Sequence, residues 1–187
     1  MDGTVKFYWG TMFAGKSTKL INDLIQAGDG AICFKPKQDT RYEEGIIRTH
    51  DGAEFPAIVV ENAEELFKLV LADLNRITTV GIEEASLFSD DEMLVDVVRK
   101  LRELGKNVII TGLDMDVHGE PFGAMPYLAA IADECYKLKA ICSCGKPASS
   151  QIYFGTDGNM IGGSDKYKPA CWQCYYEYYE KIKLPSS

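Results

Sequence analysis

The sequence has few basic residues and no long apolar run. It contains 20 Lys and Arg against 28 Asp and Glu, which gives a formal net charge of −8. A nucleic-acid-binding surface needs clustered positive charge, so this balance argues against a nucleic-acid partner. No apolar stretch approaches the roughly 20 residues that span a bilayer, and the N-terminus has no basic-then-apolar leader. We therefore expect a cytoplasmic protein with no membrane association.

Histidine and tryptophan are also scarce, with two of each, whereas there are six cysteines. Cysteines of a cytoplasmic protein are expected to be thiols or metal ligands rather than disulfides. His50 and His118 lie in loop-like sequence, and neither belongs to a catalytic motif. The hydrophobic fraction of 46% is enough for a sizeable core, and the length of 187 residues suits one domain, or one domain with a small appendage.

The most informative motif is a phosphate-binding pattern, G-x-x-x-x-G-K-[ST], near the N-terminus. It consists of Gly10, Thr11, Met12, Phe13, Ala14, Gly15, Lys16 and Ser17. An apolar, strand-like segment precedes it and an amphipathic helical pattern follows it, so a glycine-rich turn followed by an unrelated lysine explains the context poorly. In such a loop the backbone N–H groups bind phosphate, the lysine reaches the β- and γ-phosphates, and the serine ligates Mg²⁺. The motif predicts a nucleoside triphosphate site.

Short apolar runs typical of buried strands alternate with helical patterns. The predicted strands are residues 5–9, 31–34, 57–60, 78–82 and 108–111, and the predicted helices are 17–27, 63–74 and 90–104. Asn62 is a candidate N-cap, and Gly28 and Gly105 are candidate helix stops. This alternation predicts an α/β fold with a mostly parallel P-loop sheet, flanking helices, and ligands beyond the carboxyl ends of the strands.

The periodicity weakens near Leu138, and the remainder is rich in cysteine, glycine and tyrosine. We expect a P-loop nucleotide-binding domain over residues 1–139 and a small second domain over 140–187. The last tyrosines, from Tyr175 to Tyr179, predict a polar-aromatic helix that packs against a neighbour.

Two adjacent carboxylates, Glu83 and Glu84, follow the strand predicted over residues 78–82. Adjacent carboxylates repel each other, so their place at the end of a buried strand suggests a cation such as Mg²⁺ held from Ser17. One carboxylate could then serve the metal while the other acts as a base on a nucleophile. The alternative is a pair of solvated loop glutamates, which are common in an acidic protein.

Four cysteines form two close pairs, which supply the ligand count of a structural tetrahedral zinc site. They are Cys142, Cys144, Cys171 and Cys174. The second pair has the usual C-x-x-C spacing, and the first is one residue shorter. Zinc here would do no chemistry and would hold both ends of a glycine-rich loop. Cys33 and Cys135 lie in apolar runs, so we expect both to be buried small hydrophobes.

An ordered set of motifs resembles one family over nearly the whole chain, from about Phe7 to Tyr175. Besides the phosphate loop and the paired cysteines, it comprises the segments 39–42, 49–51, 83–88, 113–114, 121–123 and 161–167. Together they resemble the type II thymidine kinases, which join a P-loop (RecA-like) domain to a small zinc-ribbon-like lasso domain. The resemblance implies ATP-dependent phosphorylation of the 5′-hydroxyl of thymidine, and family members are usually homotetramers.

The resemblance also implies residue roles. Glu84 matches the catalytic base, and Glu83 stands where the family has an aspartate that helps to hold Mg²⁺. Asp39, Thr40 and Arg41 match a mobile loop whose arginine approaches the phosphates, although without the family an exposed loop arginine would be the simpler interpretation. A fixed guanidinium there would stabilise developing negative charge.

The thymine pocket implied by the resemblance includes side chains that could equally be ordinary core residues. They are Met12, Leu113, Val117, Phe122 and Tyr167, together with the lasso residues Gly158, Asn159, Met160, Ile161 and Gly162. Val117 and Leu87 replace aromatics common in the family, and Ser86 replaces a glutamine. Each lost aromatic contact weakens stacking by on the order of 1 kcal/mol. Readout of the base by lasso backbone groups tolerates these changes.

Two rival functions are open on the sequence. A P-loop ATPase or switch would use the same loop and carboxylates, but it has no need of a cysteine-tethered glycine loop. A non-enzymatic zinc-ribbon module with a vestigial P-loop would need a basic face, which the charge balance disfavours.

Overall fold

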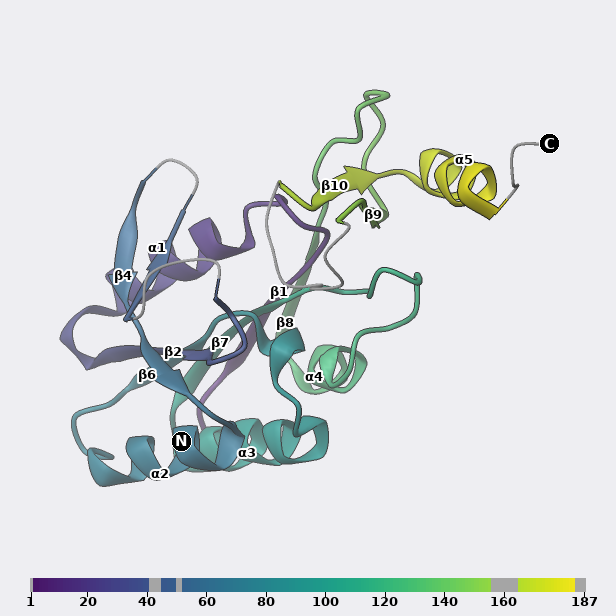
Figure 1. Cartoon of the computed structure of the whole chain (residues 1–187). Helices are drawn as coiled ribbons and strands as arrows, with labels where there is room; N and C mark the ends of the chain where they lie inside the picture. Colours follow the sequence, from purple (N-terminus) through teal and green to yellow (C-terminus); the bar gives the residue numbers. More distant parts are fainter. Residues whose placement is uncertain (1, 41–44, 50–51, 156–164, 184–187) are drawn as a thin grey trace.

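A parallel sheet lies at the centre of the computed structural model, which describes residues 2–40, 45–49, 52–155 and 165–183. The strands are ordered β5-β2-β6-β7-β1-β8, and every neighbouring pair is parallel. They are β1 (Val5–Gly10), β2 (Ala31–Pro36), β5 (Ile58–Val60), β6 (Thr79–Ile82), β7 (Asn107–Gly112) and β8 (Glu134–Leu138). The predicted α/β fold is confirmed (Figure 1).

Helices cover both faces of this sheet and give it two separate cores. The helices are α1 (Lys16–Ala27), α2 (Ala63–Ala72), α3 (Asp91–Glu103) and α4 (Met125–Ile131). Successive residues of a strand point to opposite faces. On β2, Cys33 packs in one buried cluster with Leu20 and Leu24 of α1, whereas Phe34 packs with Leu66 and Leu94 of α2 and α3 in the other.

The predicted helix cap and helix stops are confirmed by their geometry, although α2 ends at Ala72, two residues earlier than predicted. Gly28 ends α1 with a φ of 74°, a conformation that glycine adopts without a Cβ penalty. Asn62 caps α2 by accepting a hydrogen bond from the backbone N–H of Glu65 at 2.9 Å. Gly105 follows α3 with a φ of 76°.

Several short elements of the α/β body lie outside the predicted set. They are β3 (Ile46–Arg48) and β4 (Glu54–Pro56), which form a hairpin, the 3₁₀ turns η1 (Gly28–Gly30) and η2 (Ala85–Leu87), the helix α4 and the edge strand β8. The prediction that Cys135 is buried is wrong, because this residue lies on β8 and is exposed. Cys33 is buried, as predicted.

The residues after β8 form a smaller unit that projects from the sheet (Figure 1). It contains the antiparallel pair β9 (Ser150–Tyr153) and β10 (Tyr167–Ala170), followed by the predicted tyrosine-rich helix, α5 (Trp172–Lys183). We call this unit the cysteine module. Its own small core consists of Cys142, Ile152, Ala170, Cys171 and Tyr175.

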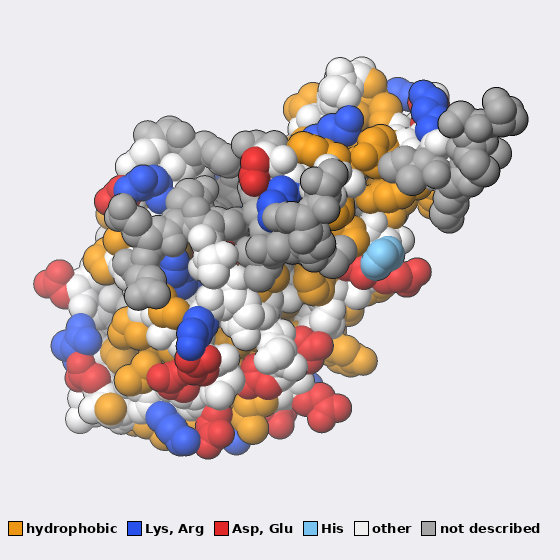
Figure 2. All heavy atoms as spheres, viewed as in Figure 1, with side chains coloured by type: hydrophobic (Ala, Val, Ile, Leu, Met, Phe, Trp, Pro, Cys, Tyr) orange, Lys and Arg blue, Asp and Glu red, His pale blue; other side chains and the backbone are white. Residues whose placement is uncertain are grey.

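Charged and apolar side chains are distributed differently over the two parts. On the face in Figure 2, acidic and basic side chains intersperse over the sheet and its helices, while apolar side chains gather on the cysteine module. Trp172 and Tyr176 of α5 stack there at 5.6 Å between ring centroids, and both are exposed. In the described ranges, no helix combines the length and the apolar character that crossing a bilayer requires.

Candidate active site and metal-binding cluster

The phosphate loop joins the carboxyl end of β1 to the first residue of α1. Gly10 and Gly15 have φ values of 133° and 80°, and a Cβ on Gly10 would lie 1.9 Å from the carbonyl oxygen of Leu138 on β8. Glycine is therefore required at the start of the loop. Lys16 is buried and donates a hydrogen bond to the carbonyl oxygen of Thr11 at 2.8 Å. Its side chain therefore folds back over the phosphate loop.

Backbone strain is concentrated at this site. Of the described non-glycine residues, Phe13 and Glu84 have positive φ, at 62° and 49°. Phe13 lies in the phosphate loop, and Glu84 is the second residue after the end of β6. Left-handed backbone is costly for residues with a Cβ, and such strain clusters at functional sites where it fixes a side chain.

Glu83 connects the two predicted halves of the site. Its Oε1 accepts a hydrogen bond from the Ser17 hydroxyl at 2.5 Å, and its Oε2 accepts one from the Thr111 hydroxyl. Glu83 and Glu84 are both almost fully buried, at 3% and 5% exposure. The alternative interpretation of the pair as solvated loop glutamates is therefore wrong. An acidic side chain that bonds the P-loop serine is suited to hold a hydrated Mg²⁺ beside the phosphates.

Thr111 belongs to the site and was not among the residues predicted from the sequence. Besides bonding Glu83, its Oγ1 accepts a hydrogen bond from the backbone N–H of Glu84 at 3.1 Å. One hydroxyl thus fixes both glutamates from the neighbouring strand β7. A polar residue at the carboxyl end of an otherwise apolar strand was the available indication, because ligands bind at that edge.

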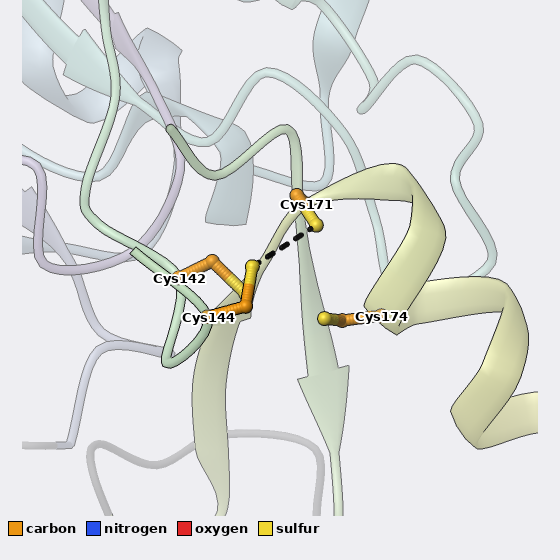
Figure 3. A group of neighbouring side chains, drawn as sticks. All are labelled: Cys142, Cys144, Cys171 and Cys174. Atoms are coloured by element: carbon orange, nitrogen blue, oxygen red, sulfur yellow. Dashed lines mark hydrogen bonds between the residues drawn. The ribbon is translucent and has the colours of Figure 1, made fainter. Parts of the chain in front are cut away.

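The four predicted cysteine ligands converge (Figure 3), and their sulfur atoms lie within 4.8 Å of one another. Cys142 and Cys144 come from a turn, Cys171 follows β10, and Cys174 lies on the first turn of α5. The Sγ atoms of Cys144 and Cys171 are 3.6 Å apart. Tetrahedral zinc with bonds of about 2.3 Å to sulfur places its ligands about 3.8 Å apart, so the cluster fits zinc.

The short first pair brings both thiols into the cluster by means of a tight turn. Gly145 has a φ of 84°, and its N–H donates to the carbonyl oxygen of Cys142 at 2.8 Å. The turn is closed by a hydrogen bond from Cys142 N–H to Lys146 O, also at 2.8 Å. The C-x-C spacing therefore brings both sulfur atoms into the cluster without the extra residue of the usual C-x-x-C spacing.

The charge of the donor set also favours a cation. Burial opposes ionisation of Cys142, but backbone hydrogen bonds from Cys144 and Cys171 outweigh it and lower the pKa of that thiol to about 6. Hydrogen bonds with its three neighbours in the cluster, Cys171 first, raise the pKa of Cys174 to about 12. Thiolates in such proximity resist further negative charge until a metal neutralises them.

A loop after β7, residues 113–124, lies between the sheet and the cysteine module. At its start the Leu113 N–H donates to the Ser86 hydroxyl at 3.2 Å. Further on, the Tyr175 hydroxyl of α5 donates to the Val117 carbonyl at 2.8 Å, and the Gln151 amide of β9 donates to Met115 O at 2.5 Å. The module thus holds the loop in place through two side chains.

The phosphate loop also contacts the start of the cysteine module. The backbone N–H of Ala140 donates to the Thr11 hydroxyl at 3.0 Å, and both residues are buried. The phosphate loop is therefore hydrogen-bonded directly to the segment that leads to the first cysteine pair.

Some of the other predicted site residues lie in the described part of the chain, with different degrees of burial, and the rest lie outside it. Met12 and Tyr167 are buried, and Leu113, Val117 and Phe122 are half-buried. Their convergence on one pocket stays a prediction. Asp39 is buried just after β2, and Thr40 is exposed. Outside the described residues lie Arg41, His50 and the predicted lasso segment Gly158, Asn159, Met160, Ile161 and Gly162.

Comparison with protein-family models matches the chain to the family described as thymidine kinase over residues 3–175. The chain belongs to the thymidine kinase family. The match includes the phosphate loop, the glutamate pair and all four clustered cysteines. Membership in this family supports a kinase that phosphorylates a nucleoside with ATP, which agrees with a P-loop site beside buried carboxylates.

Proposed function

We propose that the chain transfers the γ-phosphoryl group of ATP to the 5′-hydroxyl of thymidine, yielding thymidine monophosphate and ADP, as a type II thymidine kinase. The observation that carries the proposal is the hydrogen bond from Ser17 to Glu83, with Glu84 held one residue further on. This hydrogen bond connects the triphosphate-binding loop to the glutamate pair. The second glutamate of the pair, Glu84, is a buried carboxylate that could accept the proton of an acceptor hydroxyl.

In the proposed reaction Glu84 accepts the proton of the 5′-hydroxyl. The nucleoside oxygen forms its bond to the γ-phosphorus while the bond from that phosphorus to the β–γ bridging oxygen breaks, and ADP leaves. Little covalent chemistry falls to the protein, so positioning and charge stabilisation set the rate. The left-handed backbone at Glu84 and its hydrogen bond to the Thr111 hydroxyl support this role, because they fix the backbone from which the Glu84 side chain extends.

Ser17 and Glu83 would hold Mg²⁺, whose positive charge would be shared by the β- and γ-phosphates. The backbone of Gly10 to Gly15 and the Lys16 ammonium would bind the same phosphates. The Asp39 and Thr40 segment would carry Arg41 toward the transferred group, where a guanidinium would stabilise charge that develops in the transition state.

For the acceptor, we propose a pocket between the two parts of the chain. The thymine would contact Met12, Leu113, Val117, Phe122 and Tyr167, and the backbone of residues 158–162 would recognise its edge. The hydrogen bonds that Tyr175 and Gln151 make to the 113–124 loop support a shared pocket.

The proposed domains are residues 1–139 for the donor and 140–187 for the acceptor. Structural zinc on the four cysteines would order the second domain. A homotetramer stays a prediction from the family resemblance, and a cytoplasmic location stays a prediction from the sequence.

Replacement of Glu84 by Gln tests the base. The amide keeps the shape but cannot take a proton, so kcat should fall by about 100-fold or more while ATP and thymidine still bind. Glu61→Gln is the matched control, since Glu61 is exposed, forms an ion pair with Lys37 at 2.5 Å and is not among the proposed site residues. Steady-state kinetics with equilibrium binding of each substrate would decide it, and near-wild-type kcat in Glu84→Gln would refute the assignment.

A further inference from the structure

Lys35 is a buried lysine at the active edge of the sheet to which neither the family match nor the proposed reaction assigns a role. It lies next to the last residue of β2, and its exposure is only 1%. Lysine is almost never fully buried unless its charge is compensated, because desolvation of an ammonium group is costly. The position therefore requires negative charge nearby.

The strand register places Lys35 beside Glu83. Cys33 pairs with Gly81 and Phe34 with Ile82, so the next step along both strands brings Lys35 opposite Glu83. The backbone continues this pairing, since Glu83 N–H donates to Phe34 O at 2.9 Å. Neighbouring strands are separated by about 4.8 Å, which is close enough for the two side chains to interact.

Both side chains also belong to the same face of the sheet. Cys33 packs against α1 while Phe34 packs on the opposite face, so Lys35 returns to the α1 side. Glu83 is placed on that side by its bond to Ser17, the second residue of α1. A fixed positive charge thus lies next to the carboxylate that would hold Mg²⁺.

We propose that Lys35 is a positioning residue that acts through Glu83 as a built-in counter-ion. It neutralises part of the glutamate pair in the nucleotide-free protein and so keeps this edge from binding a divalent cation on its own. The metal then enters only with the negative charge of the triphosphate, as a metal–nucleotide complex. This inference rests on the proposed function only in that Ser17 and Glu83 serve the metal.

Metal binding without nucleotide tests this role directly. The zinc-loaded protein is titrated with Mn²⁺ and free ion is measured by electron paramagnetic resonance. Lys35→Met removes the charge at similar length and should tighten Mn²⁺ binding by at least about tenfold, because two carboxylates are left less neutralised. Lys35→Arg should bind Mn²⁺ as weakly as the wild type. Lys37→Met, at an exposed lysine two residues along, is the matched control.

The double variant Lys35→Met with Glu83→Gln locates the new site. It should return the Mn²⁺ affinity to the wild-type value, and retained tight binding would contradict the proposal. Unchanged affinity in Lys35→Met would also overturn it. If Lys35→Met does not fold, the wild type decides: tight Mn²⁺ binding that Glu83→Gln abolishes would refute the counter-ion role, whereas weak binding that is insensitive to Glu83→Gln agrees with it.

No nucleoside is present in these titrations, so they separate the two proposals. Failure of thymidine phosphorylation would leave the Mn²⁺ result standing. A Lys35→Met protein with wild-type Mn²⁺ affinity would remove the counter-ion role and leave the kinase assignment intact.

Discussion

The sheet and the cysteine module are stabilised in different ways. Both faces of the sheet are covered by helices, and its two clusters contain large buried side chains such as Phe7, Phe34 and Ile110. The core of the module is small, and two of its five buried members belong to the four-cysteine cluster. Apolar burial suffices for the first part, whereas in the second the four clustered cysteines could hold a metal that would keep its turn, strand and helix together.

This difference separates the two halves of the proposed reaction. The donor side, with Ser17, Glu83 and Thr111, is fixed by strands and a helix that need no ligand to form. The acceptor side depends on the 113–124 loop, which side chains of the module hold in place. Damage to the module should therefore affect the nucleoside before it affects ATP.

The largest effect should come from removing a cysteine ligand. Cys171→Ser leaves three sulfurs, so zinc should be lost and the module should unfold, since structural zinc contributes on the order of 10 kcal/mol of apparent binding energy. Metal analysis should find about one zinc per wild-type chain and far less in the variant. Thymidine binding should weaken strongly while ATP binding is largely retained.

Cys135→Ser is the control for this comparison, because Cys135 is exposed on β8 and outside the cluster. It should keep its zinc and both substrate affinities. Equal loss of ATP and thymidine binding in Cys171→Ser would contradict the proposal that the sheet binds ATP and the cysteine module supports thymidine binding.

A smaller effect is expected on the donor side. Ser17→Ala removes the hydroxyl that bonds Glu83, and it should lower activity by about 10 to 100-fold at fixed Mg²⁺. Thymidine affinity should not change, in contrast to Cys171→Ser. Ser89→Ala, at an exposed position, serves as the control in the same Mg²⁺ titration. Full activity of Ser17→Ala at low Mg²⁺ would contradict the metal role.

The smallest effect should come from the contact between the two parts. Tyr175→Phe removes the hydrogen bond to the Val117 carbonyl, worth about 1 kcal/mol, and should raise the KM for thymidine several-fold with little change in kcat. Tyr176→Phe is the matched control, because Tyr176 lies on the same helix and is exposed. A purely structural role would instead lower thermal stability and leave the thymidine KM unchanged.

Much of the donor half could be predicted from the sequence, because strong local patterns determine it. The apolar strands, the phosphate loop and the helix caps at Gly28 and Asn62 were all predicted from residue types at fixed spacing. The edge strand β8 was not, since it pairs with β1 alone, is largely exposed and has charged residues such as Glu134 and Lys137 among its apolar ones. Such a strand lacks the continuous apolar run of a central one.

The contacts that fix the site could not be predicted in the same way. Thr111 meets Glu83 and Glu84 only because β6 and β7 are neighbours, and strand order is not visible in local sequence. The same holds for Lys35, whose neighbour Glu83 directly follows β6. The cysteine cluster was predictable by contrast, because two close cysteine pairs supply the ligand count of a structural tetrahedral zinc site.

Phosphate transfer from γ-labelled ATP, compared across the four natural deoxynucleosides, is the most direct test of the central claim. We predict label transfer to thymidine in preference to deoxyadenosine, deoxyguanosine and deoxycytidine, with ATP consumed only when an acceptor is present. ATP hydrolysis at the same rate with and without thymidine, and no labelled thymidine monophosphate, would contradict the account and favour a P-loop ATPase.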